Sequence, residues 1–197
     1  MLTSVFHAHF TIDRVEAFDP SLLEKKFKVT IIDLENSSKG QRDFMLTRYY
    51  KPVCWEDRAK LISEVKLDAE YLSKSGLKVL RTKLECLSRG EGMLSDDEYL
   101  EVHIKIDIPP RLYKESINYL RELGLKLGFV LSRNPYSITP TIAKIFANMR
   151  FKSGLPEEGV KKVDALVEIL KQDFNISSLQ IERVVYDSNY GHDSWWA

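Results

Sequence analysis

The sequence predicts an α+β protein in which one unit of strand, helix, strand, strand, helix, strand occurs twice along the chain. Two observations predict this fold. Segments with strand-like and helix-like patterns follow the same order before and after a loop at 87–98 that is rich in glycine and charged residues. Similar stretches also stand at matching places, because "VFHAHFTID" (5–13) opens the first half and "LEVHIKID" (100–107) opens the second. We therefore expect an internal duplication, with halves at 1–90 and 91–197.

The first half contains the patterns of four strands and two helices. Apolar and polar residues alternate at 5–13, which predicts a half-buried strand. Asp19 and Pro20 are typical of a helix start and predict a short helix after this strand. Apolar residues at helical spacing predict a long helix at 55–76, which Gly76 ends. The remaining strands of this half are expected at 28–35, 42–51 and 77–86.

The second half repeats this order. Valine and isoleucine alternate with polar residues at 99–108, which predicts its first strand, and Pro109 and Pro110 open a helix that extends to Gly128. Further strands are expected at 129–134, 142–151 and 179–187, and a long helix at 155–174. Each half is therefore a βαββαβ, or ferredoxin-like, unit. We expect a bilobal domain in which the antiparallel sheets of the two halves face each other across a polar cleft.

Polar side chains gather on the sheet face that the helices of such a unit leave open. The strands at 5–13 and 99–108 place two similar sets on that face, which are His7, His9 and Thr11 in the first half and Glu101, His103 and Lys105 in the second. Further candidates to bind a ligand are Arg48, Arg81, Lys83, Arg133, Arg150 and Tyr186. Histidine, arginine and lysine on one face suit an anion, of which phosphate is the commonest. A solvated sheet surface is the alternative interpretation of the charged residues.

Composition limits the partners. Lysine plus arginine and aspartate plus glutamate both number 29, so the formal net charge is zero. Proteins that bind long nucleic acids usually carry a basic excess, so we expect a small phosphorylated ligand or an RNA end as the partner, and not duplex DNA. No apolar run is long enough for a membrane span, and the first residues lack the pattern of a signal peptide. With two widely spaced cysteines, Cys54 and Cys86, these features predict a cytoplasmic protein with reduced thiols.

The stretch "HFTI" (9–12) resembles the motif His-apolar-Thr/Ser-apolar of the two-histidine phosphoesterases, a bilobal superfamily that includes RNA 2′,5′-cyclic phosphodiesterases. Members carry the motif once in each lobe and use no metal. In "HIKI" (103–106) the histidine matches, and Lys105 stands where the family has threonine or serine. The resemblance implies that His9 and His103 are an acid/base pair, that Thr11 binds phosphate and that Lys105 replaces the second hydroxyl. It implies a cyclic-phosphodiesterase-type hydrolase without a cofactor.

Two other functions fit the same residues. His7 and His9 lie on one strand face about 7 Å apart, which suits metal chelation with His103 as a third ligand. A duplicated ferredoxin-like protein can also bind a ligand or a partner protein without catalysing a reaction. A single sequence leaves both alternatives open.

Overall fold

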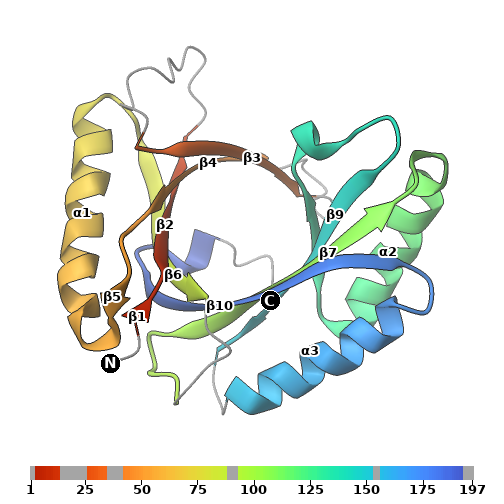
Figure 1. Cartoon of the computed structure of the whole chain (residues 1–197). Coiled ribbons are helices and arrows are strands. Elements are labelled where there is room, and N and C mark those ends of the chain that lie inside the picture. The colour runs from red at the N-terminus through yellow and green to blue at the C-terminus, as the bar shows by residue number, and fades with distance from the viewer. Residues whose placement is uncertain (1–2, 14–25, 35–41, 88–92, 153–155, 193–197) are drawn as a thin grey trace.

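The computed structural model describes residues 3–13, 26–34, 42–87, 93–152 and 156–192. They form an antiparallel sheet of eight strands that closes into a barrel, in the order β10-β6-β2-β4-β3-β8-β9-β7 (Figure 1). The barrel is surrounded by helices, with α1 on one side and α2 and α3 on the other (Figure 1). The α+β class and an antiparallel sheet are therefore confirmed.

The first half contributes four barrel strands and one described helix. These elements are β2 (Phe6–Ile12), β3 (Lys28–Leu34), β4 (Arg42–Tyr49), α1 (Arg58–Lys74) and β6 (Val79–Leu87). A small separate sheet pairs β1 (Thr3–Ser4) with β5 (Val53–Cys54), and a short 3-10 helix, η2 (Trp55–Asp57), precedes α1. Every strand predicted for this half is confirmed, as is the long helix. The short helix expected to start at Asp19 falls almost wholly outside the described residues.

The second half has the full set of six elements. They are β7 (Tyr99–Ile108), α2 (Tyr113–Leu127), β8 (Val130–Arg133), β9 (Ala143–Phe151), α3 (Pro156–Leu170) and β10 (Asn175–Asp187), with 3-10 turns η3 (Pro110–Leu112) and η4 (Pro135–Ser137). Neighbouring strands follow the order β10-β7-β9-β8, which corresponds to β6-β2-β4-β3 in the first half. The order of strands is therefore the same in both halves.

The two sheets join edge to edge. At one junction β10 pairs with β7 through Asn175–Val184 and with β6 through Glu182–Asp187, so this strand belongs to both sheets. This double pairing makes β10 longer than the strand predicted at 179–187. At the other junction β3 pairs with β8, where Asp33 lies opposite Arg133. The space between the sheets is consequently the interior of a closed barrel, where we had expected an open cleft between facing sheets.

The hydrophobic cores lie outside the barrel wall, under the helices. One cluster packs Leu61, Val65 and Leu72 of α1 against the outward face of β2, and a larger one packs α2 and α3 against β7 and β9. Burying a Leu or Phe side chain fully contributes roughly 1.5–3 kcal/mol, so these two clusters supply much of the stability. Because residues alternate along a strand, the inward faces are left to polar side chains.

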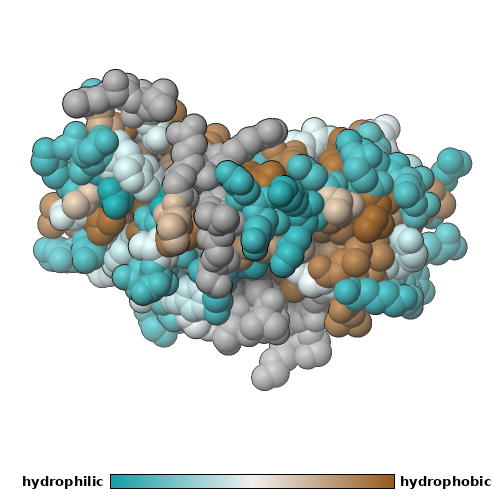
Figure 2. Space-filling model, turned by 90° about the horizontal axis from the view of Figure 1, so that it is seen from below, coloured by the Kyte–Doolittle hydropathy of each residue, from teal (hydrophilic) through white to brown (hydrophobic). Residues whose placement is uncertain are grey.

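The underside of the molecule is mostly hydrophilic, and a hydrophobic area lies toward the end that carries α2 and α3 (Figure 2). Within the described residues, no helix combines the length and the hydropathy that crossing a membrane requires.

Candidate functional site

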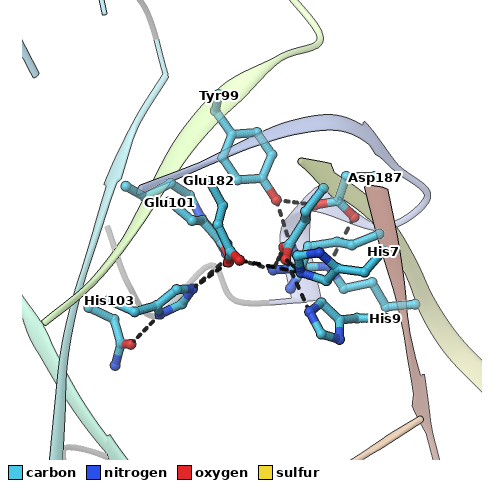
Figure 3. Close-up of polar contacts among 12 residues, drawn as sticks. His7, His9, Tyr99, Glu101, His103, Glu182 and Asp187 are labelled. Carbon is cyan, nitrogen blue, oxygen red and sulfur yellow. Dashed lines mark hydrogen bonds and ion pairs between the residues drawn. The ribbon is translucent and has the colours of Figure 1, made fainter. Parts of the chain in front are cut away.

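Polar side chains from both halves meet inside the barrel around a cavity of about 360 Å³. Its lining includes six predicted residues, which are His9, Thr11, Arg81, Lys83, His103 and Arg133. It also includes Glu85, Glu101, Asn148 and Gln180. The imidazoles of His7 and His9 approach a central group of carboxylates from one side, and His103 approaches it from the other (Figure 3). The barrel thus brings the two motif histidines to one cavity.

His9 is held by contacts at both ring nitrogens. Its Nδ1 lies 2.8 Å from Oγ1 of Thr47, which is its cross-strand neighbour on β4. Its Nε2 lies 3.1 Å from Oε2 of Glu85 on β6. Burial lowers the pKa of His9 by more than the Glu85 carboxylate raises it, so the net shift is downward from 6.5. The imidazole is therefore neutral at pH 7.

His103 is held in the matching way but carries charge. Its cross-strand neighbour on β9 is Asn148, whose Oδ1 lies 2.7 Å from His103 Nδ1. The Asn148 amide nitrogen donates to Ser132 Oγ at 3.0 Å, which leaves Oδ1 as the acceptor for the imidazole N–H. Burial lowers the pKa of His103. The hydrogen bond to Glu182 and the negative charges of Glu182 and Glu101 raise it by more, so the pKa is about 9. His103 is therefore an imidazolium at pH 7.

Carboxylates that the sequence analysis did not single out connect the histidines. Glu85 Oε2 lies 3.2 Å from His7 Nε2, and the two carboxylate oxygens of Glu182 each lie 3.3 Å from an Nε2, one from His7 and the other from His103. Burial raises the pKa of Glu85, but Lys83 and His9 outweigh it and hold that pKa well below its usual range. Alternation along β6 places Glu85 on the same face as Lys83, which is the signal that could have identified it.

The predicted cations inside the barrel already contact carboxylates. Lys83 forms ion pairs with both Glu85 and Glu101, and its pKa is raised because these charges outweigh the effect of burial. Arg150 also contacts Glu101, through Nε at 3.0 Å. Arg81 donates two hydrogen bonds to the Asp187 carboxylate, from Nε to Oδ1 at 2.9 Å and from Nη2 to Oδ2 at 2.5 Å. An entering anion therefore has to compete with these carboxylates.

Three other predicted residues lie away from the cavity lining or at its margin. Arg48 shares the outer face of β4 with Leu46. Its guanidinium binds Asp68 and Glu64 of α1, and Nη2 lies 3.0 Å from Oε1 of Glu64. Tyr186 packs partly against the cluster under α1, where Lys66 Nζ lies 5.2 Å from its ring centre.

Lys105 follows His103 on β7 and lies over the ring of Phe146, 5.9 Å from its centre. Phe146 lines the cavity, so Lys105 is at the margin of the site.

The metal set expected from sequence differs from the one that the structure brings together. Among the described residues, His7, His9 and Glu85 place one ligand atom each within 4.8 Å of the others. Glu85 thus stands where His103 was expected, because β6 is hydrogen-bonded directly to β2 whereas β7 is not.

Comparisons with known proteins add little to this geometry. No model of a protein family matches the chain, and no curated protein matches it. A solved structure of a putative monooxygenase from Fusobacterium nucleatum subsp. nucleatum ATCC 25586 is 10% identical with a TM-score of 0.36, over 95% of this chain and 94% of that chain. A mutant chlorite dismutase from Candidatus Nitrospira defluvii is 12% identical with a TM-score of 0.31, over 94% of this chain and 93% of that chain. None of these comparisons tests the resemblance of "HFTI" and "HIKI" to the two-histidine phosphoesterases, which stays a prediction.

Proposed function

We propose that the protein is a phosphoesterase that acts on a small phosphate ester or an RNA end through His9 and His103. The observation that supports this proposal is the pair of histidines with opposite protonation states in one cavity. General acid/base catalysis on a phosphodiester needs one group that accepts a proton and another that donates one. His9, which is neutral, is the base in this proposal, and His103, which is protonated, is the acid.

The matched environments of the two histidines also support an internal duplication. Each lies on the first barrel strand of its half and bonds through Nδ1 to the residue opposite it on the third barrel strand of that half, Thr47 or Asn148. Two copies of one ancestral site then differentiated into a base and an acid. The hydrogen-bond partner and the number of nearby carboxylates distinguish the two.

Phosphate binding in this proposal proceeds by exchange with carboxylates. The phosphate oxygens take over contacts with Lys83 and His103 that Glu101 and Glu182 make in the structure. Thr11 and Arg133 line the same cavity and are the further candidates to bind the ester. The contacts with phosphate are charge-assisted, as are those with the carboxylates that they replace, so the exchange trades interactions of similar strength.

The test is hydrolysis of a 2′,3′-cyclic nucleotide by the purified protein in the presence of EDTA. We expect turnover, with losses of at least roughly 100-fold in His9→Gln and His103→Gln, because each general acid or base contributes typically 10²–10⁴-fold. Lys60→Gln is the control, since Lys60 lies exposed on α1 and pairs with Asp57. Full activity in both histidine variants would refute the assignment.

Non-catalytic ligand binding is the second candidate. It is favoured by the contacts at both ring nitrogens of each histidine, with Thr47 and Glu85 around His9 and with Asn148 and Glu182 around His103. Calorimetry with a cyclic nucleotide separates the two functions. Binding without turnover in wild-type protein, reduced in Lys83→Gln, would favour this candidate over the phosphoesterase.

A further inference from the structure

We propose that His7, His9 and Glu85 form a binding site for a divalent transition metal, for which zinc is the best match, with Glu182 as a fourth ligand. The site lies inside the barrel on β2, β6 and β10. Its ligand set of two imidazoles and two carboxylates is one that zinc binds in proteins with tetrahedral geometry. Imidazole ligands also suit copper, iron and nickel. Metal binding goes beyond the proposed hydrolysis and does not depend on it.

Three of the six distances between the four ligand atoms are close to those of a tetrahedral site, and the ligand atoms of His7, His9 and Glu85 all lie within 4.8 Å of one another. Zinc binds nitrogen and oxygen at about 2.0–2.2 Å, so neighbouring ligand atoms of a tetrahedron stand roughly 3.4 Å apart. Oε2 of Glu85 lies 3.2 Å from Nε2 of His7 and 3.1 Å from Nε2 of His9. Oε1 of Glu182 lies 3.3 Å from Nε2 of His7. Small outward movements of these side chains make room for the ion.

The strands fix the ligands in this arrangement. His7 and His9 lie two residues apart on the inward face of β2, and Glu85 is the direct cross-strand partner of His7 on β6. The two rings are 4.8 Å apart between centres and inclined by 77°, and both Nε2 atoms face Oε2 of Glu85. Such a site needs little reorganisation when it binds an ion.

Partners behind the ligands orient them further. Thr47 holds Nδ1 of His9 at 2.8 Å, which leaves Nε2 for the metal. Lys83 pairs with Oε1 of Glu85, which leaves Oε2 for it. Outer partners of this kind fix the ring and the carboxylate, and their loss typically lowers metal affinity 10–100-fold.

Each ligand binds the ion in its deprotonated form, so any proton on Nε2 of His7 or His9 is released when the metal enters. The positive charge of the ion then lies beside the carboxylates of Glu85 and Glu182.

Metal binding and the proposed hydrolysis exclude each other, since a His9 imidazole that binds the metal cannot also act as the base. A zinc-loaded protein is therefore inactive on a cyclic nucleotide and a protein stripped with EDTA is active, if the proposed function holds. Binding itself is measured without any substrate, so failure of the hydrolysis leaves the metal site to be judged separately.

The experiment is a zinc titration of the full-length protein, stripped with EDTA and then freed of it, in competition with a chromophoric chelator. We expect one zinc per chain, and cobalt in its place gives the intense visible absorption of tetrahedral coordination. His7→Gln weakens zinc binding at least roughly 100-fold, the upper end of what losing an outer partner costs. Lys60→Gln, at an exposed position of α1 outside the barrel, is the control and changes it by less than about threefold.

Circular dichroism and thermal unfolding establish that both variants keep the fold. Absence of stoichiometric zinc or cobalt binding in folded wild-type protein overturns the proposal. So does zinc binding that survives His7→Gln, or that is lost equally in Lys60→Gln, since the ligands are then different residues.

Discussion

One carboxylate oxygen of Glu182 lies 3.3 Å from Nε2 of His103. The other lies at the same distance from Nε2 of His7, so one side chain of β10 connects histidines of both halves. Glu182 also stands where β10 passes from pairing with β7 to pairing with β6. Barrel closure and the charge state of the site are therefore linked through this residue.

Glu182→Gln is expected to lower the pKa of His103 from about 9 toward the ordinary value of 6.5. Glu182 both accepts a hydrogen bond from the imidazolium and stabilises its charge, whereas burial acts in the opposite direction. NMR titration of the histidine ring resonances measures the shift. Glu64→Gln is the matched control, because Glu64 binds Arg48 outside the barrel. An unchanged His103 pKa in Glu182→Gln would contradict this account of its charge.

The raised pKa of His103 also predicts how stability depends on pH. Its contribution is fully present below the unfolded value of about 6.5 and is lost as the pH rises through about 9. A pKa shift of that size means that His103 contributes on the order of 3 kcal/mol to the free energy of unfolding at low pH. The pKa of His7 is also raised, so its contribution to stability is likewise lost as the pH rises. The pKa of His9 is lowered, so its contribution is lost as the pH falls below 6.5.

Urea unfolding at pH 6.5 and pH 9 measures this contribution in wild-type protein and in His103→Gln. The wild type should lose stability between the two pH values, and the variant should lose clearly less. Equal losses in both proteins would assign the pH dependence to groups other than His103.

Lys83→Met is expected to lower the free energy of unfolding by about 3–5 kcal/mol, the usual cost of removing one partner from a buried ion pair. Lys83 contacts Glu85 and Glu101, whose side chains are both 1% exposed, so the substitution leaves two buried carboxylates without this cation. Chemical denaturation measures the loss. Adding Glu85→Gln should restore part of it, as a double-mutant cycle detects for residues in contact. Additive losses in the double variant would show that Lys83 and Glu85 do not interact.

The sequence predicted the individual elements of the fold better than their closure. Alternation at 5–13 and 99–108 placed Phe10 and Ile104 on the covered face and His9 and His103 on the other, and the structure has them so. Barrel closure depends on the pairing of β10 with β6 and of β3 with β8, which join residues far apart in the chain. Local patterns contain no information about such edges, so two separate sheets were the natural expectation.

The site was predicted in part for a similar reason. Alternation placed Glu85 on the same face as Lys83, but a charged residue on an alternating strand fits solvent, a buried ion pair or a ligand equally well, so this signal alone did not assign Glu85 to the site. Arg48 was assigned to the open face, although it shares a face with the buried Leu46, and it contacts Asp68 on α1. Apolar neighbours at even spacing would have placed Arg48 under the helix.

Asn148→Ala is expected to lower the free energy of unfolding by about 1–3 kcal/mol, because buried groups lose their partners. The Asn148 side chain accepts from His103 and donates to Ser132 Oγ at 3.0 Å and to Val130 O at 3.2 Å. It thereby connects β7, β8 and β9, and it holds the His103 ring through Nδ1. Asn118→Ala, an exposed position on α2, should have a much smaller effect.

The measurement is urea unfolding of both variants at pH 7, together with NMR titration of His103. A His103 pKa that falls in Asn148→Ala supports the role of the amide in holding the imidazolium, since Asn148 is one of the groups that raise it. Stability and pKa both unchanged would show that water replaces the amide at no cost.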